Sequence, residues 1–199
     1  MKKLLWLLSL IIGLAYPFLV FFIMRKYGAD ARMLVLFLLL VGAVYFLSHS
    51  GDRKSGGMKA VQFWGTLLVL SSLALLTFLT KNAGFVKIYP ISINLMFLVS
   101  FGSTLFFGPN MIFRFARLQD RAIDKNPHLE KIISYCRRVT QVWCLFFIVN
   151  GLISGATALW GSDMQWTLYN GFISYVLMGL LFAVEFIIRK LQERKWERS

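Results

Sequence analysis

One carboxylate in this sequence, Glu185, lies inside a long apolar stretch. The other acidic residues among the nine fall in polar segments or near the end of the chain. A charged group inside a membrane helix is costly, and it therefore often marks a functional site. Arg189 follows four residues later on the same helical face, so a salt bridge near the membrane boundary also explains Glu185. Both interpretations stay open, a functional carboxylate and an interfacial ion pair.

The sequence lacks the residue patterns on which catalytic and metal sites depend. Its two histidines, His49 and His128, have no paired metal ligand nearby, and neither a nucleophile elbow nor a glycine-rich phosphate loop is present. Cys136 and Cys144 are eight residues apart and fit neither a metal motif nor a disulfide framework. We therefore expect no catalytic residue, no metal, no cofactor and two free thiols.

Three asparagines lie in the apolar stretches of the second half of the chain, at Asn94, Asn150 and Asn170. An amide in hydrocarbon loses hydrogen bonds unless it finds a partner, so we expect each to face a neighbouring helix. Helical spacing around Asn150 predicts one shared face, formed by Trp143, Phe147, Asn150, Ser154 and Thr157. Such polar residues either bond neighbouring helices together or line a polar pocket among the last three apolar stretches.

A basic segment follows Gly108-Pro109. Its Arg114, Arg117 and Arg121 are spaced i, i+3 and i+7, on one face of a helix, and Arg138 lies further along the chain. Guanidinium groups bind phosphate and carboxylate through paired hydrogen bonds. The segment predicts either an interfacial helix on anionic lipid, or a surface for a phosphorylated or acyl headgroup or an acidic cytosolic partner.

Composition places these features in a membrane. The chain of 199 residues is 58% hydrophobic and has a mean hydropathy of +0.66, which is too apolar for a soluble domain. Six apolar stretches suit membrane crossing, at about 4–24, 33–48, 61–80, 88–108, 140–159 and 167–188. The prediction is an all-α membrane protein with one polytopic domain over residues 1–199. It is a six-transmembrane-helix bundle with a cytoplasmic amphipathic basic segment, in a loop at 109–139, between the fourth and fifth helices.

The distribution of positive charge predicts the orientation. Of the 22 Lys and Arg residues, all but five fall in segments on the same side as the N-terminus; the five are Arg25, Lys26, Arg32, Lys81 and Lys87. Because positive residues are retained inside, we expect both termini and the loop at 109–139 to be cytoplasmic. This bias and attraction to anionic phospholipid explain the net charge of +13, so we expect no nucleic-acid partner.

A G-x-x-x-G motif at Gly151 and Gly155 lies on the fifth apolar stretch. Small residues one turn apart let two helix backbones approach closely. The motif predicts tight packing inside the bundle or a homo-oligomer through this face.

An ordered set of residues runs from the fourth apolar stretch to the sixth. It includes Lys87-Ile88-Tyr89-Pro90, Asn94, Pro109, Met111-Ile112, Arg114, Ala116-Arg117-Leu118, Tyr135, Arg138-Val139-Thr140, Trp143, Asn150, Leu168-Tyr169-Asn170-Gly171, Gly179 and Glu185. This set resembles a family of small bacterial inner-membrane proteins. Their genes tend to lie in aryl-polyene and related fatty-acid-synthase-like clusters, among acyl carrier proteins, ketosynthases and lipid-type exporters. The resemblance implies an inner-membrane setting in lipid biosynthesis and no particular reaction.

Together these features predict a non-catalytic inner-membrane accessory protein that assists assembly, membrane insertion or translocation of an acyl or polyene lipid. Expected partners are anionic phospholipid and an acyl carrier protein or another cluster-encoded protein, which the basic segment would attract. Two alternatives remain, a membrane-embedded acyl or glycosyl transferase that uses Glu185 and a structural scaffold subunit of a membrane complex. The residues expected to bind lipid or partner are Arg114, Arg117, Arg121, Arg138, Asn94, Asn150, Asn170 and Glu185.

Overall fold

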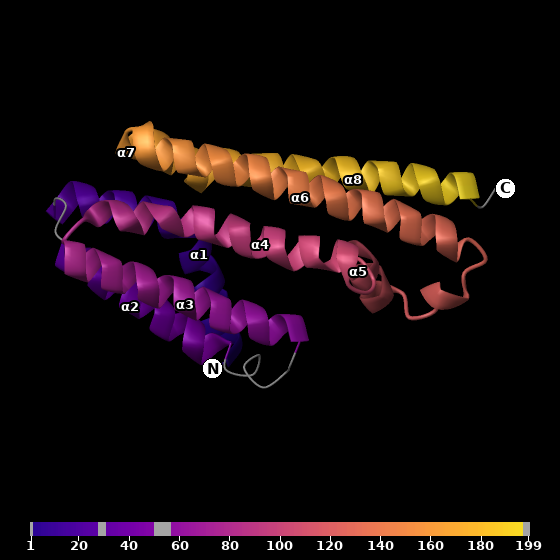
Figure 1. Ribbon diagram of the computed structural model, residues 1–199, viewed down its shortest axis with the longest axis horizontal. Coiled ribbons are helices and arrows are strands. Elements are labelled where there is room, and N and C mark those ends of the chain that lie inside the picture. The colour runs from indigo at the N-terminus through magenta and orange to yellow at the C-terminus, as the bar shows by residue number, and fades with distance from the viewer. Residues whose placement is uncertain (1, 28–30, 50–56, 197–199) are drawn as a thin grey trace. The chain divides into compact units, whose positions relative to one another are not determined.

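The computed structural model describes residues 2–27, 31–49 and 57–196, and within these ranges the chain is helical without any β-strand (Figure 1). The predicted all-helical fold class is thereby confirmed. This follows from the sequence, since long runs of Leu, Phe, Val and Ala can satisfy their backbone hydrogen bonds in lipid only within helices or closed barrels.

Three helices make up the first part of the chain: α1 (Lys2–Tyr27), α2 (Ala31–Ser48) and α3 (Gly57–Thr80). They pack through a buried apolar cluster that includes Tyr16, Leu34, Leu38, Leu70 and Leu73. Their outward faces are apolar as well; Leu68 on α3 is 71% exposed. An apolar face with no protein cover is suited to lipid, so the outward side chains support a membrane setting.

The second part of the chain alternates long and short elements. A 3-10 turn, η2 (Ala83–Ile88), leads into α4 (Tyr89–Phe106), and the short α5 (Met111–Gln119) and the 3-10 turn η3 (Ile123–Lys125) follow. The longest helix is α6 (Leu129–Trp160), after which come α7 (Asp163–Leu168), the π-helical η4 (Tyr169–Ile173) and α8 (Ser174–Trp196). The predicted loop at 109–139 therefore contains a helix of its own and the first turns of α6.

Five helical segments of the described residues are long and apolar enough to cross a membrane: Leu7–Lys26, Ala60–Thr80, Ala83–Phe106, Leu129–Trp160 and Asp163–Arg194. The second predicted span corresponds to Arg32–Ser48 of α2. This segment is also apolar, but it is shorter than the other five. Four of the five segments begin before the predicted spans, by one residue for Ala60–Thr80 and by eleven for Leu129–Trp160, where the charged first turns belong to the same helix.

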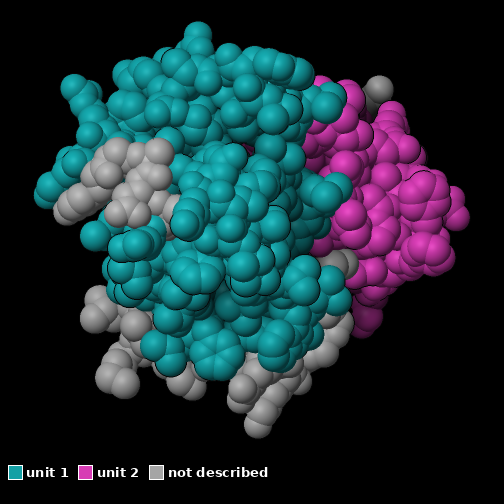
Figure 2. Space-filling view, turned by 60° about the vertical axis from the view of Figure 1, so that its left-hand side comes forward, with its two compact units in different colours: residues 1–96, 151–174 teal, residues 97–150, 175–199 magenta. Residues whose placement is uncertain are grey.

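The chain divides into two compact units, which Figure 2 colours separately. Unit 1 comprises residues 1–96 and 151–174, and unit 2 comprises residues 97–150 and 175–199. Residues of α4 and α6 belong to both units.

One end of unit 1 is held by polar contacts to η2. The indole Nε1 of Trp166 donates to the Lys87 carbonyl over 3.2 Å, and the Tyr16 hydroxyl donates to the Val86 carbonyl over 2.9 Å. Lys87, which is buried, forms an ion pair with Asp163 at the start of α7. These bonds satisfy the polar groups of a turn that lies between apolar helices.

The glycine motif of α6 packs within the chain. A Cβ added at Gly151 would lie 3.3 Å from the Cβ of Asn94, and one at Gly155 would lie 3.8 Å from Cδ1 of Ile91. Both neighbours belong to α4, so this face is used for close helix packing in unit 1, the first of its two predicted uses.

Candidate functional site

The position of α5 is set by a buried asparagine at its N-terminus. The side-chain Oδ1 of Asn110 accepts from the backbone N–H of Phe113 over 3.0 Å, which is an N-cap. Its Nδ2 donates to the Ile133 carbonyl of α6 over 3.4 Å. The Thr140 hydroxyl accepts from the N–H of Ile112 over 3.3 Å, and the Thr104 hydroxyl accepts from the N–H of Met111 over 2.9 Å. These bonds hold the start of α5 against α6 and α4.

One face of α5 is buried and the other is exposed. Met111 and Phe113 are buried, and Phe113 packs in a small cluster with Ile123 and Cys136. Leu118 and Arg117 are exposed. The segment is therefore an amphipathic helix, as the arginine spacing predicts, with one face against unit 2 and the other turned outward.

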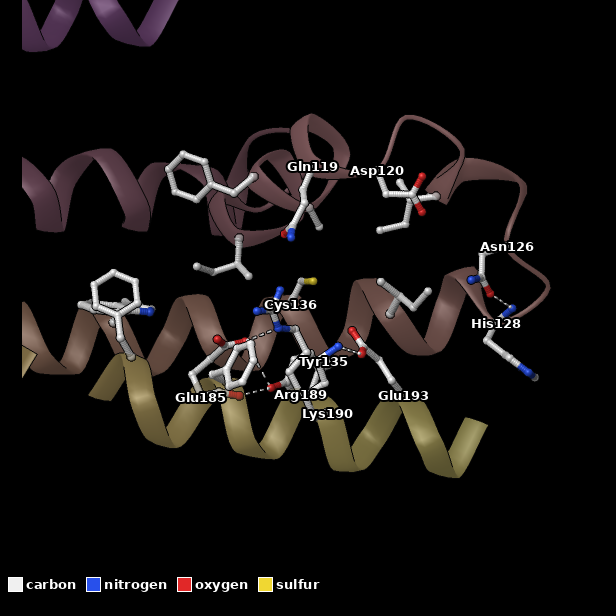
Figure 3. A pocket seen from close by; sticks show the side chains of 18 residues that line it. Gln119, Asp120, Asn126, His128, Tyr135, Cys136, Glu185, Arg189, Lys190 and Glu193 are labelled. Carbon is white, nitrogen blue, oxygen red and sulfur yellow. Dashed lines mark hydrogen bonds and ion pairs between the residues drawn. The ribbon is translucent and has the colours of Figure 1, made fainter. Parts of the chain in front are cut away.

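A pocket of about 620 Å³ lies between α5, the turn that follows it, α6 and α8, all within unit 2 (Figure 3). Its volume is within the range of roughly 300–1,000 Å³ usual for small-molecule sites. The helix pair α6 and α8 forms one wall, where the rings of Trp143 and Phe182 lie 4.5 Å apart. Side chains of α5, including Ile112, Phe115 and Ala116, form the other wall.

The polarity of the pocket changes along the helices. Trp143 and Phe182 line it at one end, while His128 just before α6 and Lys190 and Glu193 near the end of α8 line it at the other. From Phe182 to Glu193 the helix rises by about 16 Å. The pocket is therefore amphiphilic, apolar toward the middle of the helices and charged toward their ends.

Tyr135, Glu185 and Arg189 lie together in the pocket wall, where Figure 3 shows them gathered between α6 and α8. The Tyr135 hydroxyl is 3.4 Å from both the backbone oxygen and Oε1 of Glu185. Nε of Arg189 lies 3.6 Å from the same Oε1, an ion pair slightly longer than a hydrogen bond. That nitrogen is buried and has no hydrogen-bond partner among the described residues. The pair predicted from the sequence is thus present in the pocket wall.

The four arginines predicted to bind lipid or a partner do not line this pocket. The Nε of Arg114 donates to the Pro109 carbonyl over 2.8 Å. Arg117 pairs with Asp124 at 2.8 Å, and its guanidinium lies over the Phe113 ring. Arg121 and Arg138 are exposed. Three of the four thus lie on α5 or in the turn directly after it, outside the pocket.

The predicted asparagines are buried, but in two units. Asn94 and Asn170 lie in unit 1, and Asn150 and Glu185 lie in unit 2. Nδ2 of Asn94 donates to the Pro90 carbonyl over 2.8 Å, and Nδ2 of Asn170 donates to the Trp166 carbonyl over 2.9 Å. Asn170 also reaches the Thr157 hydroxyl of α6 at 3.4 Å. Of these contacts, the one between Asn170 and Thr157 joins two helices, whereas the bonds to Pro90 and Trp166 go to carbonyls four residues earlier.

Sequence reasoning missed most of the pocket. Its α8 wall follows a helical stripe that begins inside the last apolar stretch and continues past its end, through Phe182, Glu185, Phe186, Arg189, Lys190 and Glu193. That stripe was available in the sequence. The facing wall could not be predicted from the sequence, because it depends on the hydrogen bonds by which Asn110 and Thr140 position α5.

Among the residues that the structure describes, no three His, Cys, Asp or Glu side chains are grouped so that they would hold a metal ion. Cys136 and Cys144 are both free and buried. Comparisons of the chain with protein-family models, with curated proteins and with solved structures find no match.

Proposed function

We propose that this chain is a six-span accessory protein of the bacterial inner membrane that binds an acyl amphiphile in the pocket of unit 2. In binding it, the protein assists assembly, insertion or translocation of an acyl or polyene lipid. The observation that carries the proposal is the polarity gradient of the pocket, from Trp143 and Phe182 to Lys190 and Glu193. An acyl chain fits the first end and a polar head fits the second.

The proposed orientation follows from charge. With α2 as a crossing beside the five longer helical segments, both termini and α5 lie in the cytoplasm, together with most of the Lys and Arg residues. The charged end of the pocket then lies at the cytoplasmic surface of the bilayer. A lipid made inside the cell enters the pocket with its acyl chain first. The chain then points toward the hydrocarbon core, and the head stays at the cytoplasmic surface.

The charges of the pocket favour an uncharged or zwitterionic head over a free carboxylate. Its lining contains three carboxylates, Asp120, Glu185 and Glu193, and two cations, Arg189 and Lys190. Each cation has a carboxylate partner, at 3.6 Å for Arg189 and 3.4 Å for Lys190. The carboxylate of a bound fatty acid would be repelled by Asp120, and no unpaired cation of the lining would compensate for this repulsion. A hydroxyl, ester or zwitterionic head carries no net negative charge and does not meet this cost.

The same ion pair favours binding over catalysis. A general base needs a carboxylate that can reach a proton of the substrate. Glu185 is half-buried, and its Oε1 lies between Tyr135 and Arg189. This arrangement orients the wall of a binding pocket, in keeping with a non-catalytic protein.

The test is photo-crosslinking of the full chain in nanodiscs with a monoacylglycerol that carries a diazirine in its acyl chain. Bulk lipid reaches exposed residues such as Val184 and Ile187, but Trp143 and Cys136 are each only 4% exposed. We expect labelling at Trp143 and Cys136 that excess unlabelled monoacylglycerol removes. Labelling confined to exposed residues, and insensitive to competition, would overturn the proposal.

A matched pair of variants sharpens this test. Ala116→Phe places a ring in the pocket, whereas Ala183→Phe adds the same ring on an exposed position of α8 that does not line it. Ala116→Phe should abolish the competed labelling, and Ala183→Phe should leave it intact. Thermal unfolding in detergent identifies any variant that fails to fold. Equal labelling in two folded variants would contradict the assigned pocket.

A further inference from the structure

The outward face of α5 carries arginines and large apolar side chains side by side. We define the α5 outer face as Arg114 and Leu118 of the helix, with Arg121 just after it, Phe106 at the end of α4 and Phe107 directly after α4. The three apolar residues are among the most exposed in the described chain, at 79% for Leu118, 80% for Phe106 and 77% for Phe107. No described residue of the chain covers them.

We propose that this face is inserted in the headgroup layer of an anionic bilayer, so that α5 lies on the membrane surface. The inference does not depend on the pocket or on its ligand. An interfacial helix buries apolar side chains about 5–10 Å into the headgroup region and holds cations near lipid phosphates. Leu118 follows Arg114 by four residues, so the apolar and cationic groups share one face.

The local charge balance supports an anionic partner. The segment 109–139 contains seven cations, Arg114, Arg117, Arg121, Lys125, Lys131, Arg137 and Arg138, against the three acids Asp120, Asp124 and Glu130. Of the described cations in this segment, Arg117 is paired with Asp124. Arg121 is exposed beyond the end of α5. The excess of positive charge attracts the anionic leaflet and orients the helix toward it.

The apolar side chains select a membrane over an acidic soluble protein. A protein that docks through charge alone would leave Phe106, Phe107 and Leu118 in water. A bilayer instead removes these side chains from water while the arginine stems extend to the phosphates. Phe107 and Gly108 come directly after the segment Ala83–Phe106, which is long and apolar enough to cross a membrane, so this position is at the membrane boundary.

The test places a nitroxide label on Leu118→Cys in the full chain and measures its contact with oxygen and with a water-soluble nickel chelate. The chain is reconstituted in nanodiscs of phosphatidylcholine alone or with phosphatidylglycerol. Cys136 and Cys144 are buried, and the unsubstituted chain shows whether they react. We expect the label to be shielded from the chelate, and more strongly when phosphatidylglycerol is present. A label equally open to the chelate in both lipids would overturn the proposal.

Two pairs of charge variants locate the effect. Arg114→Gln with Arg121→Gln should abolish the response to phosphatidylglycerol. Lys125→Gln with Lys131→Gln removes the same charge from exposed positions away from the α5 outer face, and it should retain the response. If both pairs lost the response to phosphatidylglycerol equally, the response would come from the overall positive charge of the segment and not from insertion of the α5 outer face. Because the pocket-filling variant Ala116→Phe leaves this face intact, failure here is distinguishable from failure of the amphiphile site.

Discussion

Asn110 is the side chain on which the position of α5 depends most directly. Its amide caps the Phe113 N–H and reaches the Ile133 carbonyl of α6, and the residue is buried. A buried amide that bonds two elements restricts both of them. The pocket wall formed by α5 therefore depends on this residue of the preceding turn, together with the Thr104 and Thr140 hydroxyls.

Replacement of Asn110 by Ala should lower the stability of α5. The cap is worth about 0.5–2 kcal/mol, and its loss leaves a buried N–H without an acceptor. Hydrogen exchange of residues 111–119 should become faster, and the thermal transition in detergent should fall. Gln141→Ala, at an exposed polar position of α6, is the control. Unchanged exchange in α5 would show that other contacts position the helix.

The charge of Glu185 should set the head-group preference of the pocket. Glu185→Gln removes the carboxylate that lies 3.6 Å from Arg189 Nε and leaves the guanidinium available to an anion. A hydrogen bond to a charged group contributes about 1.5–3 kcal/mol, which corresponds to roughly tenfold or more in affinity. Binding of a fatty acid should therefore strengthen by about that factor relative to its methyl ester. An unchanged ratio of the two affinities would exclude this role for Glu185.

At the scale of residues, the sequence predicted local contacts better than tertiary ones. The spacing of Glu185 and Arg189 predicts their pairing because both lie on one helix. Asn110 could have been identified as a cap, since it directly precedes an amphipathic stretch. Its bond to Ile133 could not have been predicted, because the two residues are 23 positions apart and the sequence does not show how the chain between them folds.

At the scale of the helices, the backbone at the end of α6 leaves no room for a side chain at Gly161. A Cβ added there would lie 2.6 Å from the backbone oxygen of Thr157, an atom that cannot move without the helix. Gly179 on α8 has nothing within 4 Å of the same position. The two glycines therefore provide opposite tests of the backbone geometry.

Gly161→Ala should destabilise the protein, and Gly179→Ala should be neutral or stabilising. Alanine in a helix is favoured over glycine by roughly 0.5–1 kcal/mol when space allows, as at Gly179. At Gly161 the clash forces the turn between α6 and α7 to shift. Thermal unfolding of the two variants in one detergent gives the comparison. A more stable Gly161→Ala variant would contradict the structure of this turn.

The helices were predicted well where hydropathy alone decides their limits. The second predicted span ends at residue 48, where α2 ends, and the third ends at residue 80, where α3 ends. The start of α6 at Leu129, eleven residues before the predicted span, was not found. Hydropathy detects the lipid-facing part of a helix, whereas Leu129–Val139 is helical but charged. The pocket needs these charged turns, so it could not be located from the apolar stretches.

For the whole molecule, the central issue is which side of the membrane each connection occupies. In the described part of the chain, five helical segments are long and apolar enough to cross, and α2 is shorter. The proposed six crossings put both termini on one side and give the α5 outer face and the charged end of the pocket access to the cytoplasm. An odd number of crossings would separate the termini and remove the charge argument for that orientation.

The most direct test is cysteine labelling of α6 from its two ends. Lys125 and Met164 are exposed residues on either side of this helix. A membrane-impermeant maleimide applied to right-side-out spheroplasts should label Met164→Cys, and it should label Lys125→Cys only after the membrane is permeabilised. Labelling of Lys125→Cys in intact spheroplasts would contradict the cytoplasmic position of α5 and the entry of lipid from inside the cell.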